Sequence, residues 1–130
     1  MVDKFVINNL RDCPLRSPRP GYVPTSNGCG SEGGNHFPNN PTMGNDSTGP
    51  GNFLAACNNH DICYGTCNSI KYQCDSNFLS EMNLVCNTDF ALPLQRRKCL
   101  YFARLYGSAV AFVGGQAYED GQKAACTCCP

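Results

Sequence analysis

Cysteines are the strongest constraint on how this chain can fold. The 130 residues include 11 cysteines, spread along the chain from Cys13 to Cys129. Such a density is typical of a small domain held together by disulfides, which form in an oxidising compartment. We therefore expect a secreted protein in which residues 1–130 form one domain. Because 11 is odd, one cysteine should be free, bonded to a small molecule or paired with a second chain.

Charge and hydropathy exclude several classes of protein. The formal net charge is 0, so no long-range attraction to nucleic acid or to an anionic membrane is implied. No window has the ~18 consecutive apolar residues that a membrane-spanning helix requires. The first residues, Met1–Lys4, do not open a signal peptide, and we interpret the sequence as a mature chain without its leader.

The segment Phe53–Cys67 has the periodicity of an amphipathic helix. Five of its side chains fall at offsets of 0, 4, 7, 11 and 14 and so share one face: Phe53, Cys57, His60, Tyr64 and Cys67. Asp61 follows His60 and points about a quarter turn away. The helix therefore presents a base in one direction and a carboxylate in the next.

Two other interpretations of His60 compete with a catalytic one. A histidine on an apolar helix face is more often a satisfied core residue, and its neighbours Cys57, Cys63 and Cys67 suggest half of a zinc site. Against the first stands the adjacent Asp61. Against the second, the remaining cysteines show no second pair at zinc-finger spacing. We favour catalysis, whereas a zinc module would contain metal as isolated and unfold with a chelator.

This motif resembles the active-site helix of the secreted phospholipase A2 family, which reads Cys-x-x-His-Asp-x-Cys-Tyr. The matching residues are Cys57, His60, Asp61, Cys63 and Tyr64. Segments 18–22 and 26–31 look most like the group XII branch. The same holds for the continuation through Cys67, Lys71, Cys74, Asp75 and Phe78. The resemblance covers residues 18–86 strongly and the C-terminal third weakly.

The resemblance implies a mainly α, disulfide-rich phospholipase A2-like fold with an antiparallel two-helix platform, a calcium loop and a third C-terminal helix. The residue pattern predicts the platform helices at about 53–65 and 71–86. A third helix is expected from Cys99, after an interruption at Pro93. Residues 13–25 contain four prolines and should be extended and irregular.

The register of the two platform helices decides which carboxylate faces His60. Facing residues of an antiparallel pair keep a roughly constant sum of residue numbers. For a Cys63–Cys74 disulfide this sum lies within one helical turn of that for His60 with Asp75. In this register Asp75 reaches the imidazole.

A Cys67–Cys74 disulfide would instead place Glu81 opposite His60. The resemblance favours the first register, which makes His60 and Asp75 the catalytic pair. Cys67 then needs another partner, either Cys86 or a terminal cysteine, and the sequence does not choose between them.

The segment Asn27–Gly34 contains four glycines in eight residues, which allow its carbonyl groups to turn inward. Taken alone it is equally an ordinary surface loop. The resemblance implies a Cys29–Cys57 disulfide, which would hold this loop beside His60 and Asp61.

Calcium is the cofactor that the resemblance implies, and it takes 6–8 oxygen ligands, many of them from the backbone. The family loop reads Cys-Gly-x-Gly-Gly. The corresponding loop of this chain, Cys29–Gly34, is one residue longer. The carried-over ligands are the carbonyls of Gly28 and Gly30 and the carboxylate of Asp61. The third carbonyl is assigned to Glu32, with Gly33 as the alternative.

These parts match the activity that the resemblance implies, which is calcium-dependent hydrolysis of the sn-2 ester of a glycerophospholipid at a membrane or micelle surface, with water activated by His60. The products would be a lysophospholipid and a fatty acid. The alternative is a weak or inactive binding protein or toxin subunit on the same fold, which the lengthened loop favours. Calcium-dependent release of fatty acid distinguishes the two.

Overall fold

The structure is a computed structural model that describes residues 13, 15–30, 37–44 and 48–128. Within these ranges the chain forms four helices and two short strands. The elements are β1 (Arg16–Pro18), α1 (Leu54–Tyr64), α2 (Lys71–Asp89), α3 (Pro93–Val113), α4 (Gly115–Ala125) and β2 (Cys126–Cys128).

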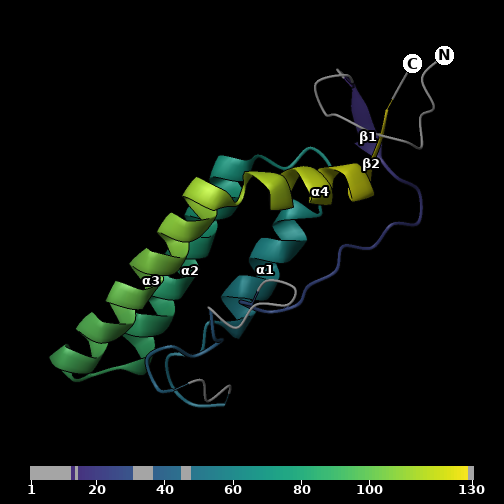
Figure 1. Ribbon diagram of the computed structural model, residues 1–130. Helices are drawn as coiled ribbons and strands as arrows, with labels where there is room; N and C mark the ends of the chain where they lie inside the picture. The colour runs from purple at the N-terminus through teal and green to yellow at the C-terminus, as the bar shows by residue number, and fades with distance from the viewer. Residues whose placement is uncertain (1–12, 14, 31–36, 45–47, 129–130) are drawn as a thin grey trace.

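Two long antiparallel helices, α2 and α3, lie side by side along the molecule (Figure 1). Helix α1 packs against α2, also antiparallel, and α4 crosses the end of this three-helix layer. The strands β1 and β2 pair antiparallel beyond α4, with Ser17 opposite Thr127. This pairing joins a segment near the N-terminus to one near the C-terminus.

The core lies between α1, α2 and α3. It is made of large apolar side chains and disulfide sulfurs, namely Phe53, Ala56, Cys57, Phe78, Met82, Cys86, Phe90, Cys99, Ala103 and Tyr106. Burying each large apolar side chain contributes about 1.5–3 kcal/mol to stability. The helix that carries the candidate base is therefore fixed against two others.

Five disulfides between described residues fasten these elements. Cys29–Cys57 and Cys63–Cys74 form as expected, and the others are Cys13–Cys128, Cys67–Cys126 and Cys86–Cys99. The eleventh cysteine, Cys129, lies outside the described residues. The mainly α, disulfide-rich phospholipase A2-like fold is confirmed.

Three details of the expected architecture were wrong. The third helix begins at Pro93 and not at Cys99, because proline fits the first turn of a helix, where its missing N–H is not needed. A separate α4 follows Gly114. Residues 16–18, expected to be irregular, pair with β2, because the late disulfides bring a partner strand to them.

Within the described ranges, none of the helices has a stretch that is both long and apolar enough to cross a bilayer.

Candidate active site

Helix α1 places His60 in the interior, where 6% of the side chain is exposed. Its Nε2 lies 2.8 Å from Asp75 Oδ1 on α2. The imidazole stacks on the ring of Phe78, with centroids 4.6 Å apart, and contacts the ring of Tyr64. Since an ionised carboxylate only accepts hydrogen bonds, Nε2 carries the proton and Nδ1 is the basic nitrogen.

Asp75 accepts hydrogen bonds from three side chains. Besides His60, the hydroxyl of Tyr64 donates to Oδ1 at 2.6 Å and the amine of Lys71 donates to Oδ2 at 2.7 Å. Burial raises the pKa of Asp75, but the hydrogen bonds from His60, Lys71 and Tyr64 outweigh it, so the pKa lies below its ordinary value. Asp75 is thus held as a carboxylate with its position fixed.

Tyr64 has the opposite perturbation. Burial, followed by its hydrogen bond to Asp75, raises the pKa of its hydroxyl well above the ordinary value. Tyr64 is therefore a permanent hydrogen-bond donor to Asp75 and not an acid or base.

The structure settles the register of the platform. His60 and Asp75 meet as expected. Glu81, the alternative partner, accepts a hydrogen bond from Asn59 Nδ2 at 3.3 Å on the exposed side of α1.

The zinc hypothesis was wrong, because Cys57, Cys63 and Cys67 are consumed in disulfides and cannot supply thiolates. Among the described residues, no cluster of three or more His, Cys, Asp or Glu side chains is placed to hold a metal ion.

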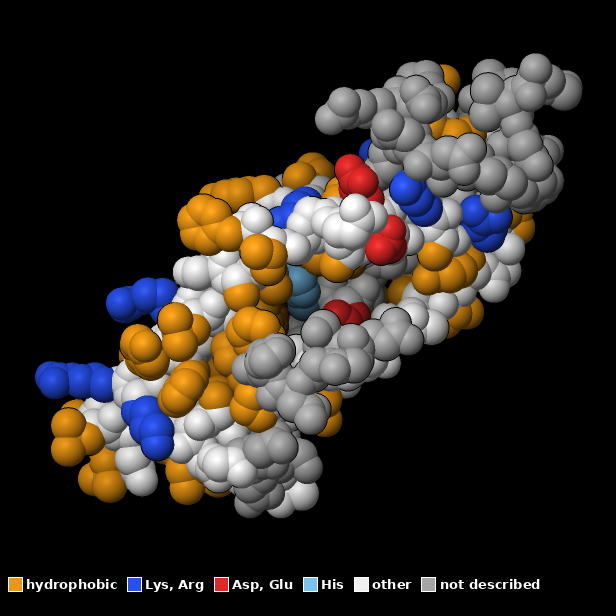
Figure 2. All heavy atoms as spheres, viewed as in Figure 1, with side chains coloured by type: hydrophobic (Ala, Val, Ile, Leu, Met, Phe, Trp, Pro, Cys, Tyr) orange, Lys and Arg blue, Asp and Glu red, His pale blue; other side chains and the backbone are white. Residues whose placement is uncertain are grey.

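His60 and Asp61 line a cavity of about 330 Å³. Most of its wall is apolar and comes from α1, α2, α3 and the loop before α1, with Phe37, Phe78, Tyr106, Val110 and Val113 among the lining residues. Figure 2 shows a hollow on this face with a histidine side chain at its floor and a carboxylate beside it. The cavity therefore combines polar groups at one end with room for an apolar chain.

The loop at residues 27–30 is fastened over Asp61 through its backbone N–H groups. The amide of Asn27 donates to Asp61 Oδ2 at 3.0 Å, and that of Gly28 to Asn58 Oδ1 at 2.9 Å. Gly28 has φ +79°, and a Cβ there would lie 3.0 Å from Asn39 Oδ1. Glycine is therefore required at this turn.

These residues fit a hard cation such as calcium. Gly28, Gly30 and Asp61 line the same cavity. Within the described ranges, no hydrogen bond occupies the carbonyls of Gly28 and Gly30 or the Oδ1 of Asp61. Burial raises the pKa of Asp61 more than the Asn27 amide and His60 lower it, and a cation would offset this cost.

Two predicted ligands cannot be placed. Glu32 and the alternative Gly33 both lie outside the described residues. The third carbonyl ligand stays a prediction.

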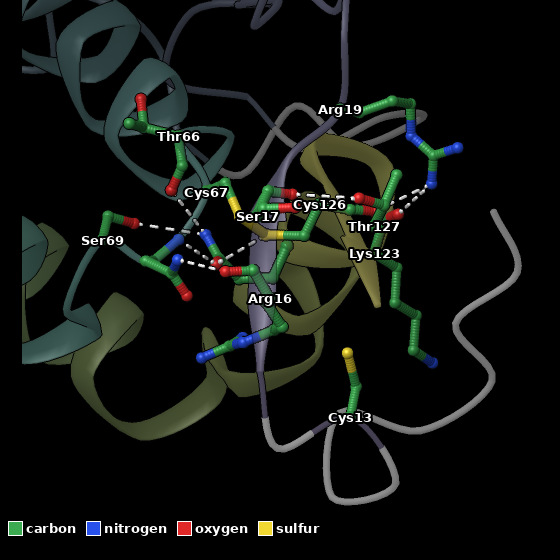
Figure 3. Close-up of a disulfide and its surroundings, with 12 residues drawn as sticks. Cys13, Arg16, Ser17, Arg19, Thr66, Cys67, Ser69, Lys123, Cys126 and Thr127 are labelled. Carbon is green, nitrogen blue, oxygen red and sulfur yellow. Dashed lines mark hydrogen bonds between the residues drawn. A yellow bond between two sulfur atoms is a disulfide. The ribbon is translucent and has the colours of Figure 1, made fainter. Parts of the chain in front are cut away.

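The end of α1 is supported from behind by α4. Gln122 is fully buried, and its Nε2 donates to the carbonyls of Tyr64 and Thr66 while its Oε1 accepts the N–H of Asn68. The Cys67–Cys126 disulfide ties the same turn to β2 (Figure 3). These contacts fix the backbone that carries Tyr64 and, one turn earlier, His60.

Several residues of the site were not given a role by the sequence. Lys71 is four residues before Asp75, a helical spacing at which opposite charges pair, and this signal was available. The register that places Asp75 opposite His60 also places Phe78, one turn further on, beside the imidazole, so this stacking could have been found as well. By contrast, the loop is anchored by Asn58, which accepts the N–H of Gly28, and by Asn39, which accepts the N–H of Cys29. These contacts depend on the path of the loop in space, and no spacing in the sequence indicates them.

Comparison with known proteins identifies relatives of the chain. A family model described as group XII secretory phospholipase A2 precursor matches residues 8–130. Group XIIA secretory phospholipase A2 of Homo sapiens is 33% identical over 116 residues, which are 85% of this chain and 57% of that protein. The Mus musculus protein of the same name is also 33% identical, with 85% of this chain and 56% of that protein covered.

The group XIIB secretory phospholipase A2-like protein of Mus musculus is 31% identical over 117 residues, covering 85% of this chain and 57% of that protein. The chain thus spans little more than half the length of the curated relatives it matches. No solved structure matches it.

Proposed function

The chain belongs to the group XII secretory phospholipase A2 family, and from this premise we propose that it is a secreted, calcium-dependent phospholipase A2. The reaction is hydrolysis of the sn-2 ester of a glycerophospholipid. The products are a lysophospholipid and a free fatty acid. The protein binds its substrate as a peripheral protein at the surface of a membrane or micelle.

The observation that carries this proposal is the contact of 2.8 Å between His60 Nε2 and Asp75 Oδ1 at the floor of the cavity. Asp75 keeps the proton on Nε2, so Nδ1 accepts one proton from a water molecule as the water oxygen attacks the ester carbonyl. The imidazolium is stabilised by the same carboxylate. The ester C–O bond then breaks, and Nδ1 returns its proton to the departing oxygen of the lysophospholipid.

Asp61 with the carbonyls of Gly28 and Gly30 would hold the calcium ion, joined by a third carbonyl from the Glu32 region. When bound there, calcium supplies positive charge for the substrate phosphate and for the oxyanion that develops at the carbonyl. The loop contacts made by Asn27 and Gly28 keep these oxygens at the same end of the cavity as His60.

The apolar part of the cavity fits the acyl chain. Phe37 packs edge-on against Tyr106, with ring centroids 5.0 Å apart, and Val110 and Val113 continue the wall along α3. The hydroxyl of Tyr106 donates a hydrogen bond to the carbonyl of Pro38, so this polar group needs no partner from the acyl chain. A fatty acyl group can therefore be buried beside His60 without leaving a polar group unpaired.

Fatty acid release from mixed phospholipid micelles tests the proposal, with calcium and with a chelator. His60→Gln should lower the rate at least ~10²-fold, because it removes the base and keeps the size of the side chain. Calcium affinity and the circular dichroism spectrum should be unchanged. Activity within tenfold of the parent would remove His60 from the reaction. A parent that binds calcium and micelles but releases no fatty acid would favour the inactive binding protein.

A further inference from the structure

Helix α3 leaves a row of large apolar side chains uncovered on its outer side. Leu94, Tyr101, Leu105 and Phe112 are 78%, 56%, 44% and 87% exposed. Their spacings of seven, four and seven residues place them on one stripe of the helix. The opposite side of α3 is buried against α2 through Cys99, Ala103 and Tyr106. The stripe is therefore a second apolar face, separate from the core.

The charges on α3 all have one sign. The helix contains four basic residues, Arg96, Arg97, Lys98 and Arg104, and no acidic one. Arg96 donates to the carbonyls of Phe90 and Ala91. The other three are exposed, and within the described ranges they form no ion pair. Figure 2 shows basic side chains projecting between hydrophobic ones along this helix.

The carboxylates of the neighbouring helix do not neutralise this surface. Each carboxylate of α2 already accepts hydrogen bonds from other groups. Asp75 accepts them from His60 and Lys71. Glu81 accepts one from Asn59, and Asp89 accepts one from the backbone N–H of Gly51. The net charge of the whole chain is 0, but the charge is unevenly distributed. An attraction that acts within a Debye length of about 8–10 Å depends on this local surface and not on the total.

We propose that α3 docks the protein on an anionic phospholipid surface, with the stripe of Leu94, Tyr101, Leu105 and Phe112 entering the headgroup region and Arg97, Lys98 and Arg104 contacting lipid phosphates. The inference rests on the proposed function, whose membrane surface it specifies. Helices with an apolar stripe and basic flanks lie in the plane of such an interface. Each basic residue near an anionic surface adds to the attraction.

The position of the cavity favours a phospholipid surface as the partner of α3. The C-terminal end of α3 supplies Ala109, Val110 and Val113 to the cavity wall, and Val113 is itself largely exposed. The stripe on the outside and the wall on the inside are therefore continuous at this end of the helix. A lipid in a bilayer seated on α3 would face the cavity at Val113 and move into it without first entering water.

Single tryptophans report the docking directly, because the sequence contains none. Leu94→Trp and Phe112→Trp mark the two ends of the stripe, and Val23→Trp is the control, at a position that is 74% exposed and precedes α1. All three are made in the His60→Gln background, so that the vesicles stay intact. With calcium and vesicles of phosphatidylcholine mixed with phosphatidylserine, both stripe reporters should shift their emission to the blue while the control does not. A shift confined to the control would overturn the proposal.

Charge is tested by sedimentation with the same vesicles. Arg97→Gln with Arg104→Gln should lower the partition coefficient about 30-fold, or about fivefold for each charge. Lys123→Gln on α4 removes one charge elsewhere and should have little effect. If the double variant and Lys123→Gln lowered the partition coefficient equally, the assignment of α3 as the docking helix would be overturned. A dimer in analytical ultracentrifugation that Leu105→Asp dissociates would overturn it too, because a second copy would then cover the stripe.

A short-chain phospholipid below its critical micelle concentration separates the two proposals. In the chain that keeps His60, the Arg97→Gln, Arg104→Gln double variant and Leu105→Asp should hydrolyse it at the parental rate, since none of these positions lines the cavity. If the parent hydrolyses it but the stripe reporters do not respond to vesicles, the docking surface is wrong and the proposed function stands. If the reporters respond and no protein hydrolyses it, the docking surface stands and the proposed function is wrong.

Discussion

The amine of Lys71 lies 2.7 Å from Asp75 Oδ2 and 2.9 Å from the carbonyl oxygen of Val110. One side chain thus links the carboxylate that orients His60 to the helix that lines the cavity. Asp75 accepts a hydrogen bond from the Lys71 amine at Oδ2 and one from the His60 imidazole at Oδ1. The position of Asp75 and the position of the cavity wall are therefore coupled through Lys71.

Lys71→Met should raise the pKa of the Asp75 carboxyl. This pKa is lowered by hydrogen bonds that include the one from Lys71. Without the amine Asp75 therefore becomes protonated at a less acidic pH. The carboxyl carbon chemical shift of Asp75, followed by NMR across pH, measures the change, and Lys71→Arg should reverse most of it. If the Asp75 titration were the same in the methionine variant, Lys71 would act through packing alone.

Asp75→Asn should leave a folded, calcium-binding protein with a moderately reduced rate. The base remains, but an amide holds the imidazole tautomer less firmly than a carboxylate. Glu81→Gln is the matched control, since its exposed contact with Asn59 is worth under ~1 kcal/mol. Steady-state rates of both variants decide the assignment. A larger loss in Glu81→Gln would strike Asp75 from the site.

Asp61→Asn should act through the metal. The substitution keeps an oxygen that can accept the N–H of Asn27, so the loop stays closed, but it removes the charge that a calcium ion would bind. Calcium affinity should fall sharply, and turnover with it. Isothermal titration calorimetry measures the first quantity. Unchanged affinity would place the ion elsewhere in the molecule.

Gly114→Ala should destabilise the protein, whereas Gly115→Ala should not. A Cβ on Gly114 would lie 2.3 Å from the carbonyl oxygen of Val110 and 2.8 Å from the hydroxyl of Tyr64, while one on Gly115 meets nothing within 4 Å. Overpacking of this kind costs about 1–3 kcal/mol. Urea unfolding of the two variants gives the comparison. Equal stabilities would show that the α3–α4 junction moves apart at little cost.

The site was predictable where one helical period brings residues together. His60, Asp61 and Tyr64 follow from the pattern of α1. Asp75 belongs to one of the two helix registers that the residues left open, and the resemblance to the phospholipase A2 family favoured that register. These relationships involve short separations and regular geometry. The sequence therefore contains nearly all the information needed to place them.

The rest depends on contacts between distant parts of the chain. The partner of Cys67 stayed open, because sequence spacing does not reveal that α4 folds back over the turn after α1. Arg16–Pro18 has no strand pattern of its own and becomes a strand through β2. Helix α4 begins at Gly115, directly after Gly114, and its buried Gln122 binds the turn after α1, a contact that sequence spacing does not reveal.

The Cys67–Cys126 disulfide also sets the order of events during biosynthesis. Its two cysteines are 59 residues apart, so at ~5–20 residues per second a ribosome makes Cys126 roughly 3–12 s after Cys67. During that interval Cys63 and Cys74 are already present and compete for the Cys67 thiol. Disulfides form and reshuffle over seconds to hours. We therefore expect the yield of native protein in a producing cell to depend on disulfide isomerisation as well as on packing.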